Sequence, residues 1–337
     1  MVMGISGVIP NFLVVMLFLG VLVYGAEELI KSLTALAKSF GVSDVFIAMT
    51  VVSVGTSLPE ITAHVMASVG ILSGFLQYKA ASAAVLGGNI GSDVVQQTLI
   101  IGIVVLGMGG LNFSKEFLKK DYLPMIGTTL ITLILSVDVF LSDFAVLSRI
   151  DGLILLGCFI GYMIFLYKSQ SSIIHDHPER DESKNVPLDV LKVIIGMAAI
   201  IVSAHIALQS TQELVNMTGL GGSLIGVVTL GVASAFPEMF TAISALRHKA
   251  AGISLGTLIG SNITNPLLGI GLGALISTYW VPAPLYLWDL PMETITAALL
   301  LVYLLFHHEK LGRAGGVYLI FLYIFYIIIR FMFFAVD

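Results

Sequence analysis

Charged residues are scarce in this sequence. Asp, Glu, Lys and Arg together make up 11% of its 337 residues, whereas 57% are hydrophobic. The 16 basic residues are outnumbered by 21 acidic ones, and the net charge of -5 disfavours binding to nucleic acid or to anionic lipid headgroups. A chain of this composition is predicted to be an integral membrane protein rather than a soluble one.

Cysteine is almost missing as well. Cys158 is the only one, so an intrachain disulfide, a thiolate metal cluster and a redox pair are all excluded. The chain also lacks the His-Glu-x-x-His pair of zinc hydrolases, and nothing in it resembles the repeated carbonyl rings of a channel filter. We therefore expect neither an enzyme nor a passive channel, and no resident cofactor.

Long hydrophobic runs fill almost the whole chain. At about 20 apolar residues per span, they predict an all-α integral membrane protein with ten transmembrane helices. These helices are expected near residues 9–30, 43–72, 80–109, 122–140, 148–167, 188–211, 220–247, 250–278, 287–306 and 314–334. The charged stretch between the fifth and sixth spans is the only linker of any length.

The two halves of the chain repeat one another in sequence. The motif GTSLPE at 55–60 recurs as ASAFPE at 233–238, which is 178 residues later. Further along, GSD at 91–93 recurs as GSN at 260–262. Each half contains five predicted spans, and an odd number of spans makes the second half enter the membrane from the opposite face. The pattern therefore predicts two inverted five-helix repeats.

The distribution of positive charge agrees with this topology. Of the 16 Lys and Arg residues, 13 follow odd-numbered spans, and the positive-inside rule places those loops in the cytoplasm and both termini outside. We expect residues 1–167 to form the first repeat and residues 188–337 the second, inverted one. A cytoplasmic linker at 168–187 would join them.

The repeated motif places a proline and a carboxylate inside two apolar segments. Proline lacks an N–H and clashes with the preceding turn, so Pro59 and Pro237 should break their helices and free backbone carbonyls. Free carbonyls are tolerated in a membrane only where they are buried in protein or line a cavity. Glu60 and Glu238 follow these breaks, and a charge at such a depth costs at least ~2.5 kcal/mol unless it is compensated. Both are candidate functional groups.

The second repeated element is rich in glycine. The segments 87–93 and 256–262 are expected to open out in the third and eighth spans, with glycines that allow close backbone approach. The candidate ligands from these spans are Ser92 and Ser261 near the carboxylates and, one helical turn further on the same face, Gln96 and Asn265. Asp93 has two interpretations of equal weight, a site residue or the N-cap of a broken half-helix.

This set of side chains is a ligand set for a hard cation. Carboxylates, carbonyls, hydroxyls and amides suit Ca²⁺, which takes 6–8 oxygens, and differ from thiolate or imidazole sites. Two carboxylates are neutralised by one Ca²⁺ or by several Na⁺ ions. Moving the bare pair through a dry barrier would be costly, so the conformational change should require a bound cation, which predicts obligatory exchange.

The two Pro-Glu motifs and the paired Gly-Ser-(Asp/Asn) elements resemble the alpha repeats of the calcium/cation antiporter superfamily, and most closely the prokaryotic sodium/calcium exchangers. The resemblance covers essentially the whole chain. It implies a monomeric antiporter that exchanges Ca²⁺ for Na⁺ by alternating access across the prokaryotic inner membrane. It also implies ligand roles. Glu60 and Glu238 would be the central carboxylates shared by both ions, Thr56 and Ser234 would bind Ca²⁺ through their backbone carbonyls, and Ser57, Ser92 and Ser261 would be Na⁺ ligands.

The chain departs from the family pattern at several ligand positions. Ala235 stands where the family usually has a serine, Ala233 replaces a glycine, and Gln96 replaces an asparagine. The alternative counter-ion is H⁺, with Glu60 and Glu238 carrying protons and His64 assisting, although a lone histidine in a span is more often a structural donor. Proton-coupled relatives typically carry a Gly-Asn-x-x-Glu motif, which is absent here, so Na⁺ is favoured.

Overall fold

The computed structural model describes residues 2–39, 53–137, 145–170, 186–239, 242 and 251–337. Its α-helices are α1 (Val2–Ser39), α3 (Ser53–Thr56), α4 (Leu58–Leu72), α5 (Tyr78–Val95), α6 (Ile101–Met108), α7 (Lys115–Phe117), α8 (Leu123–Ser136), α9 (Arg149–Gln170), α10 (Val186–Thr218), α11 (Gly222–Gly226), α12 (Val232–Ser234), α14 (Ala251–Thr264), α15 (Gly271–Ser277), α16 (Leu290–Phe306) and α17 (Arg313–Phe333). Wider π-helical turns join several of them, namely η2 (Gln96–Ile100), η3 (Leu118–Tyr122), η4 (Val227–Gly231), η5 (Asn265–Ile270) and η6 (Leu285–Asp289).

These helices form a membrane protein, as the composition predicts. Within the described ranges, seven helices are long and apolar enough to cross a membrane, and two shorter apolar helices cover Leu58–Leu72 and Gly222–Ser234. Every one of the ten predicted segments contains helix, although parts of 43–72, 122–140 and 220–247, and residue 250 of 250–278, lie outside the described residues. The all-helical fold is therefore confirmed, and the count of ten spans stays a prediction.

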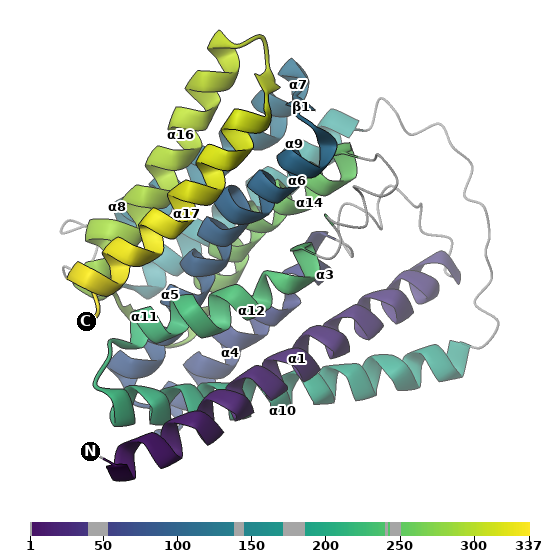
Figure 1. Ribbon diagram of the computed structural model, residues 1–337. Helices are drawn as coiled ribbons and strands as arrows, with labels where there is room; N and C mark the ends of the chain where they lie inside the picture. The colour runs from purple at the N-terminus through teal and green to yellow at the C-terminus, as the bar shows by residue number, and fades with distance from the viewer. Residues whose placement is uncertain (1, 40–52, 138–144, 171–185, 240–241, 243–250) are drawn as a thin grey trace.

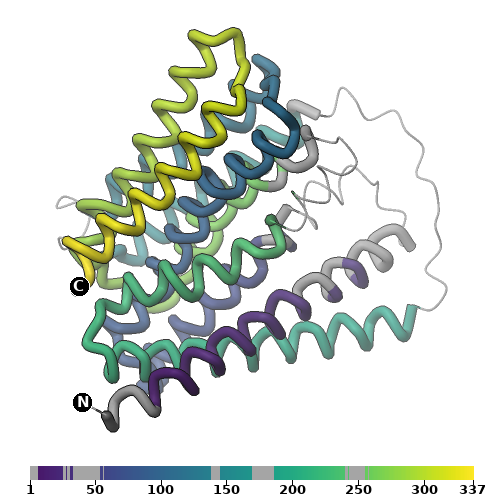
Figure 2. The backbone as a smooth tube through the Cα atoms, in the orientation of Figure 1, coloured from purple at the N-terminus to yellow at the C-terminus, as the bar shows by residue number. Residues whose placement is uncertain are grey.

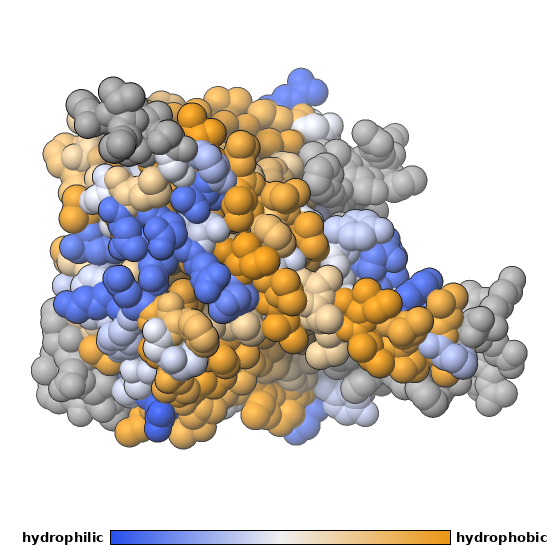
Figure 3. All heavy atoms as spheres, turned by 90° about the horizontal axis from the view of Figure 1, so that it is seen from below, coloured by the Kyte–Doolittle hydropathy of each residue, from blue (hydrophilic) through white to orange (hydrophobic). Residues whose placement is uncertain are grey.

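The surface is apolar where lipid would contact it. Leu17 of α1 is 62% exposed and Ile194 of α10 is 60% exposed, and hydrophobic side chains cover much of the face in Figure 3, with hydrophilic ones gathered in a patch. Soluble proteins rarely expose so much apolar area to water, whereas a membrane-spanning surface exposes it to lipid hydrocarbon. The long helices α1 and α10 lie side by side along one edge of the bundle (Figures 1 and 2).

The helix contacts come in two matching sets. Gly102 of α6 lies against Gly316 of α17, and Gly152 of α9 lies against Gly271 of α15. A Cβ added to Gly316 would lie 3.0 Å from the Gly102 oxygen, and a Cβ added to Gly152 would lie 2.7 Å from the Gly271 oxygen. Gly271 follows Gly102 by 169 residues and Gly316 follows Gly152 by 164, so each contact is the counterpart of the other. Glycine at both sides lets the backbones touch.

Two short antiparallel ribbons have the same relationship. Strand β1 (Leu111–Asn112) pairs with β4 (Lys310–Leu311), and β2 (Val146–Leu147) pairs with β3 (Tyr279–Trp280). Strands β1 and β3 each follow a span that carries a Gly-Ser element, whereas β2 and β4 each precede the last span of their half. Each ribbon therefore joins the two halves of the chain.

The helix breaks predicted at the prolines are present. A turn at Ser57 separates α3 from α4, which begins at Leu58 with Pro59 in its first turn. The amide of Ile61 donates to the Ser57 carbonyl at 3.0 Å. In the second half, a turn at Ala235 separates α12 from the helical residues 236–239. The glutamates therefore begin new helical stretches, as their position after proline predicts.

The expected opening of the glycine-rich elements is wrong. Helix α5 runs without interruption through 87–93, and α14 runs through 256–262. No proline interrupts either ladder, and the missing Cβ serves packing instead, because a Cβ on Gly91 would lie 2.8 Å from the Cα of Val227. The helices widen only afterwards, in η2 and η5, which begin at the equivalent residues Gln96 and Asn265.

Candidate cation-binding site

Glu60 and Glu238 are both buried, and serine hydroxyls link the residues around them. Glu60 lies in the first turn of α4 and is 4% exposed, and Glu238 lies after the Ala235 turn and is 0% exposed. The hydroxyl of Ser92 donates to Glu60 Oε1 at 3.1 Å, and that of Ser261 donates to Glu238 Oε1 at 3.0 Å. Both carboxyl groups are therefore held by a serine from the Gly-Ser element of their own half.

Hydroxyl and amide groups connect the residues around Glu60 with those around Glu238. The hydroxyl oxygens of Ser57 and Ser261 lie 3.3 Å apart. Gln96 Nε2 donates to Ser92 Oγ at 3.1 Å, and Asn262 Nδ2 donates to Gln96 Oε1 at 3.0 Å. The side chains of α5 and η2 are thereby tied to those of α14 through the same groups that surround the carboxylates.

Several buried oxygens in this region have no hydrogen-bond partner. They are Glu60 Oε2, Glu238 Oε2, Asn89 Oδ1, Gln97 Oε1 and Asn265 Oδ1. All five are acceptors, and a buried acceptor left without a donor costs roughly 1–3 kcal/mol. A bound cation would satisfy them, so the oxygens present fit a hard cation such as Ca²⁺ or Na⁺.

Acidic side chains alone do not complete such a site. Among the described residues, no group of three His, Cys, Asp or Glu could hold a metal ion. Ca²⁺ takes 6–8 oxygens, so serine hydroxyls, amides and backbone carbonyls would have to supply most of its ligands. At the helix breaks, the carbonyls of Ser57 and Ala235 accept from the amides of Ile61 and Met239 at 3.0 Å. The carbonyls of the preceding residues, Thr56 and Ser234, are therefore the backbone candidates.

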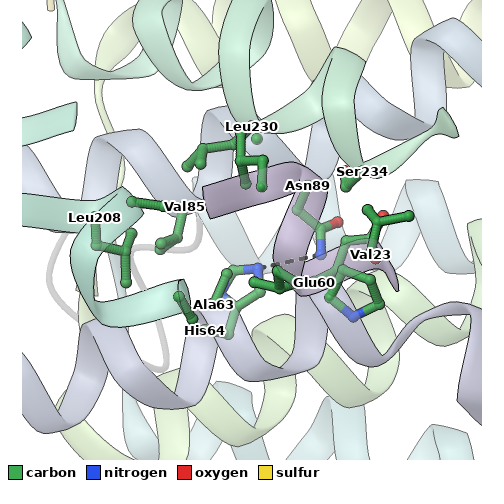
Figure 4. A pocket seen from close by; sticks show the side chains of 15 residues that line it. Val23, Glu60, Ala63, His64, Val85, Asn89, Leu208, Leu230 and Ser234 are labelled. Carbon is green, nitrogen blue, oxygen red and sulfur yellow. Dashed lines mark hydrogen bonds between the residues drawn. The ribbon is translucent and has the colours of Figure 1, made fainter. Parts of the chain in front are cut away.

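A small cavity reaches Glu60 from the side of α1 and α10. It has a volume of about 20 Å³ and is lined mostly by apolar side chains, together with Glu60, His64, Asn89 and Ser234. In Figure 4, Leu208 lies at the opposite end from Glu60 and Ser234. A hollow of this size holds about one water molecule, which is the scale of a single ion rather than of an organic substrate.

The remaining candidates are placed as follows. Ser234 ends α12, and its hydroxyl donates to the Gly231 carbonyl at 3.3 Å while facing the carboxyl group of Glu60. Thr56 ends α3 directly before the Ser57 turn. Asn265 Nδ2 donates to Asp93 Oδ1 at 2.9 Å. The structure therefore brings all the predicted ligands to one region, with Thr56 placed there by its backbone.

The structure decides between the alternatives left open for two residues. Asp93 lies inside α5, so it cannot be the N-cap of a half-helix. The ring of His64 meets Tyr279 Oη at 3.2 Å and Asn89 Nδ2 at 3.1 Å, and the described hydrogen bonds include none between His64 and Glu60. The structural role of His64 is therefore favoured over a shared proton, because its two ring nitrogens are already engaged.

Sequence reasoning missed a fourth carboxyl group. Glu293 of α16 is 2% exposed, and Gln97 Nε2 donates to its Oε1 at 3.3 Å and to Asn262 Oδ1 at 3.1 Å. Glu293 directly follows the Leu-Pro-Met element at 290–292 inside a predicted span, so an ionisable residue in an apolar run was a usable signal. The repeat comparison does not reveal it, because the equivalent residue in the first half is Ile126.

Comparison with known proteins gives relatives along the whole chain. The chain is 26% identical to the sodium/calcium exchanger MaX1 of Methanosarcina acetivorans over 95% of its own length and 98% of that protein. It is also 26% identical to the inner membrane protein YrbG of Escherichia coli, over 88% of its own length and 89% of the relative.

Among solved structures, the sodium-calcium exchanger NCX_Mj soaked with 10 mM Na⁺ and zero Ca²⁺ matches with a TM-score of 0.61 and 24% identity, covering 96% of this chain and 98% of the other. This likeness supports the same fold. The family model described as sodium/calcium exchanger protein matches residues 10–168 and 189–332, which is most of the chain. The chain therefore belongs to the sodium/calcium exchanger protein family.

Proposed function

We propose that the protein is a secondary antiporter that exchanges Ca²⁺ for Na⁺ across a membrane by alternating access. The observation that carries this proposal is the buried pair Glu60 and Glu238. Each carboxyl group has one oxygen bound by a serine hydroxyl and one oxygen without a partner. Such oxygens, surrounded by further hydroxyls and amides, suit a hard cation.

The proposed ligands are the two carboxylates and the oxygen-bearing groups around them. Glu60 and Glu238 would neutralise one Ca²⁺ together, with backbone carbonyls of Thr56 and Ser234 completing part of its shell. The hydroxyls of Ser57, Ser92 and Ser261, together with Gln96, Asn265 and Asp93, would hold Na⁺ when Ca²⁺ is absent. The contact between the Ser57 and Ser261 hydroxyls at 3.3 Å supports a set shared between the two halves.

The charge of the two carboxylates would couple ion binding to the conformational change. The empty site would carry two like charges in a dry interior, and exposing that pair to the low-dielectric barrier is costly. A bound Ca²⁺, or Na⁺ ions in its place, would remove the repulsion and permit the conformational change. Because both carboxylates are almost fully buried, an ion could leave only after the helices rearrange, which makes the transport an exchange.

The proposed architecture is two inverted five-helix repeats, 1–167 and 188–337, joined by the linker 168–187. The matching helix contacts and ribbons support it, since inverted repeats place equivalent contacts on opposite sides. The excess of Lys and Arg after odd-numbered spans favours external termini. By analogy with the inner membrane protein YrbG of Escherichia coli, we place the chain in a prokaryotic inner membrane. We also propose that it functions as a monomer.

Ion flux into vesicles containing the purified protein tests the exchange. We expect Ca²⁺ uptake when the vesicles are loaded with Na⁺ and the pH is equal on both sides. Uptake that requires a pH gradient and ignores Na⁺ would instead support H⁺/Ca²⁺ antiport. Uptake driven by neither gradient, with no saturation by Ca²⁺, would contradict exchange altogether.

A further inference from the structure

Glu293 brings an additional carboxyl group to the crossing of α5, α14 and α16. Its side chain is buried, and the described part of the chain contains no ion pair between Glu293 and a basic residue. The nearby Arg330 is bound instead to Asp289, at 3.0 Å. A buried carboxylate without a basic partner is costly, so Glu293 is neutralised either by a proton or by a bound cation.

Glu293 is joined to the helix that carries Asp93. Gln97, which donates to Glu293, follows Asp93 by four residues along α5 and η2, so both lie on the same face of that helix. Glu293 and Asp93 are each held by an amide nitrogen, since Gln97 donates to Glu293 at 3.3 Å and Asn265 donates to Asp93 at 2.9 Å. The two carboxyl groups therefore form a second acidic pair beside the first.

The amide groups that hold this second pair also carry unpartnered oxygens. Gln97 Oε1 and Asn265 Oδ1 are buried without a hydrogen-bond partner, in side chains that are 2% and 0% exposed. The orientation of Gln97 is fixed, because its amide nitrogen meets two acceptors, on Asn262 and Glu293. Its carbonyl end must then lie beside the same carboxyl group. Acceptors without donors next to carboxylates are the surroundings of a cation.

We propose that Glu293 and Gln97, together with Asp93 and Asn265, form a second cation site that takes a monovalent cation, with Na⁺ as the physiological candidate. This proposal rests on the proposed exchange. Glu293 Oε1 and Asp93 Oδ1 already accept hydrogen bonds from amide nitrogens. One further oxygen on each carboxylate and the two free amide oxygens remain, which is fewer than the 6–8 oxygens of Ca²⁺. Ca²⁺ therefore belongs between Glu60 and Glu238, and the second site adds one Na⁺ to the Na⁺-loaded protein.

Equilibrium binding of radioactive Ca²⁺ to the purified full chain, with Na⁺ as competitor, tests this assignment. In Glu293→Gln, we expect the Hill coefficient for displacement of Ca²⁺ by Na⁺ to fall by about one, because one cooperating Na⁺ site is lost. The effect on Ca²⁺ affinity measured without Na⁺ should be smaller. Glu116→Gln is the matched control, since Glu116 is exposed and pairs with Lys120 at 2.5 Å; its competition curve should match the unmodified protein.

Glu293→Asp gives a second readout if the glutamine variant does not fold. It keeps the charge but shortens the side chain, so the Na⁺ concentration for half displacement should rise while the Hill coefficient stays the same. An unchanged Na⁺ curve in both variants would overturn the second site, and so would a joint loss of Ca²⁺ and Na⁺ binding. Failure of the unmodified protein to bind any Ca²⁺ is a different result and would contradict the proposed exchange itself.

Discussion

Replacing Glu238 by glutamine removes one of the two charges proposed to hold Ca²⁺ while changing little else. The side chain is 0% exposed, and its Oε1 accepts a hydrogen bond from Ser261 at 3.0 Å. Glutamine has nearly the same shape and keeps an oxygen that can accept this bond. Any loss of binding in Glu238→Gln therefore reports the missing charge.

The magnitude follows from Coulomb's law. Two unit charges 4 Å apart at an effective dielectric constant of 20 attract by about 4 kcal/mol, and a divalent ion doubles this value. Even if half of that attraction is offset by desolvation, about 4 kcal/mol remains, which is roughly a thousandfold in affinity. We expect Ca²⁺ affinity to fall by at least that factor and exchange to stop.

The assay is Ca²⁺ binding to purified Glu238→Gln, followed by flux in vesicles. Glu116→Gln again serves as the control, because it makes the same chemical change in an exposed helix turn, where charges are screened. A normal thermal unfolding curve would establish that Glu238→Gln is folded. If the folded variant bound Ca²⁺ within about tenfold of the unmodified protein, a loss of only ~1.4 kcal/mol, Glu238 could not be a direct ligand.

Three further changes test other parts of the account. Ser57→Ala should weaken the response of the flux to Na⁺ more than to Ca²⁺, and an unaltered Na⁺ dependence would remove Ser57 from the Na⁺ sites. Gly226→Ala should lower the free energy of unfolding by about 1–3 kcal/mol through overpacking, because the new Cβ would collide with the Ala84 carbonyl oxygen. Gly157→Ala should leave the free energy of unfolding unchanged, because a Cβ there meets nothing within 4 Å. Equal unfolding temperatures for the two variants would refute the predicted overpacking. Arg330→Met leaves Asp289 buried without its partner and should cost about 3–5 kcal/mol, so an unchanged unfolding temperature in detergent would contradict the structural role of this ion pair.

The sequence contains enough information to locate the carboxylate pair. Glu60 and Glu238 could be found because each lies in an apolar run and each recurs in the other half, and the physics of burying charge marks such positions. The helix breaks beside them also follow from proline chemistry. The serines follow from their spacing, because Ser92 and Ser261 lie at equivalent positions of their spans.

Contacts that depend on tertiary packing could not be predicted in this way. Glu293 has no acidic counterpart in the first half, so only its depth in the membrane distinguishes it. The helix was predicted to open within the glycine-rich segment 87–93, but it widens only after it, in η2. Glycine can serve either an open helix or a tight helix crossing, and the close approach of η4 to Gly91 decides for the crossing. His64 lines the same cavity as Glu60, but its hydrogen-bond partners, Tyr279 and Asn89, come from other elements and could not be predicted from spacing.

The central claim is that one cation lies between Glu60 and Glu238. Diffraction from crystals soaked in Sr²⁺, a heavier stand-in for Ca²⁺ with a strong anomalous signal, tests it most directly. The account predicts an anomalous peak within roughly 2.3–2.6 Å of a carboxylate oxygen of both residues, allowing slightly more for the larger ion. A peak bound to neither glutamate, or carboxylates that turn away from each other when the ion is present, would contradict it.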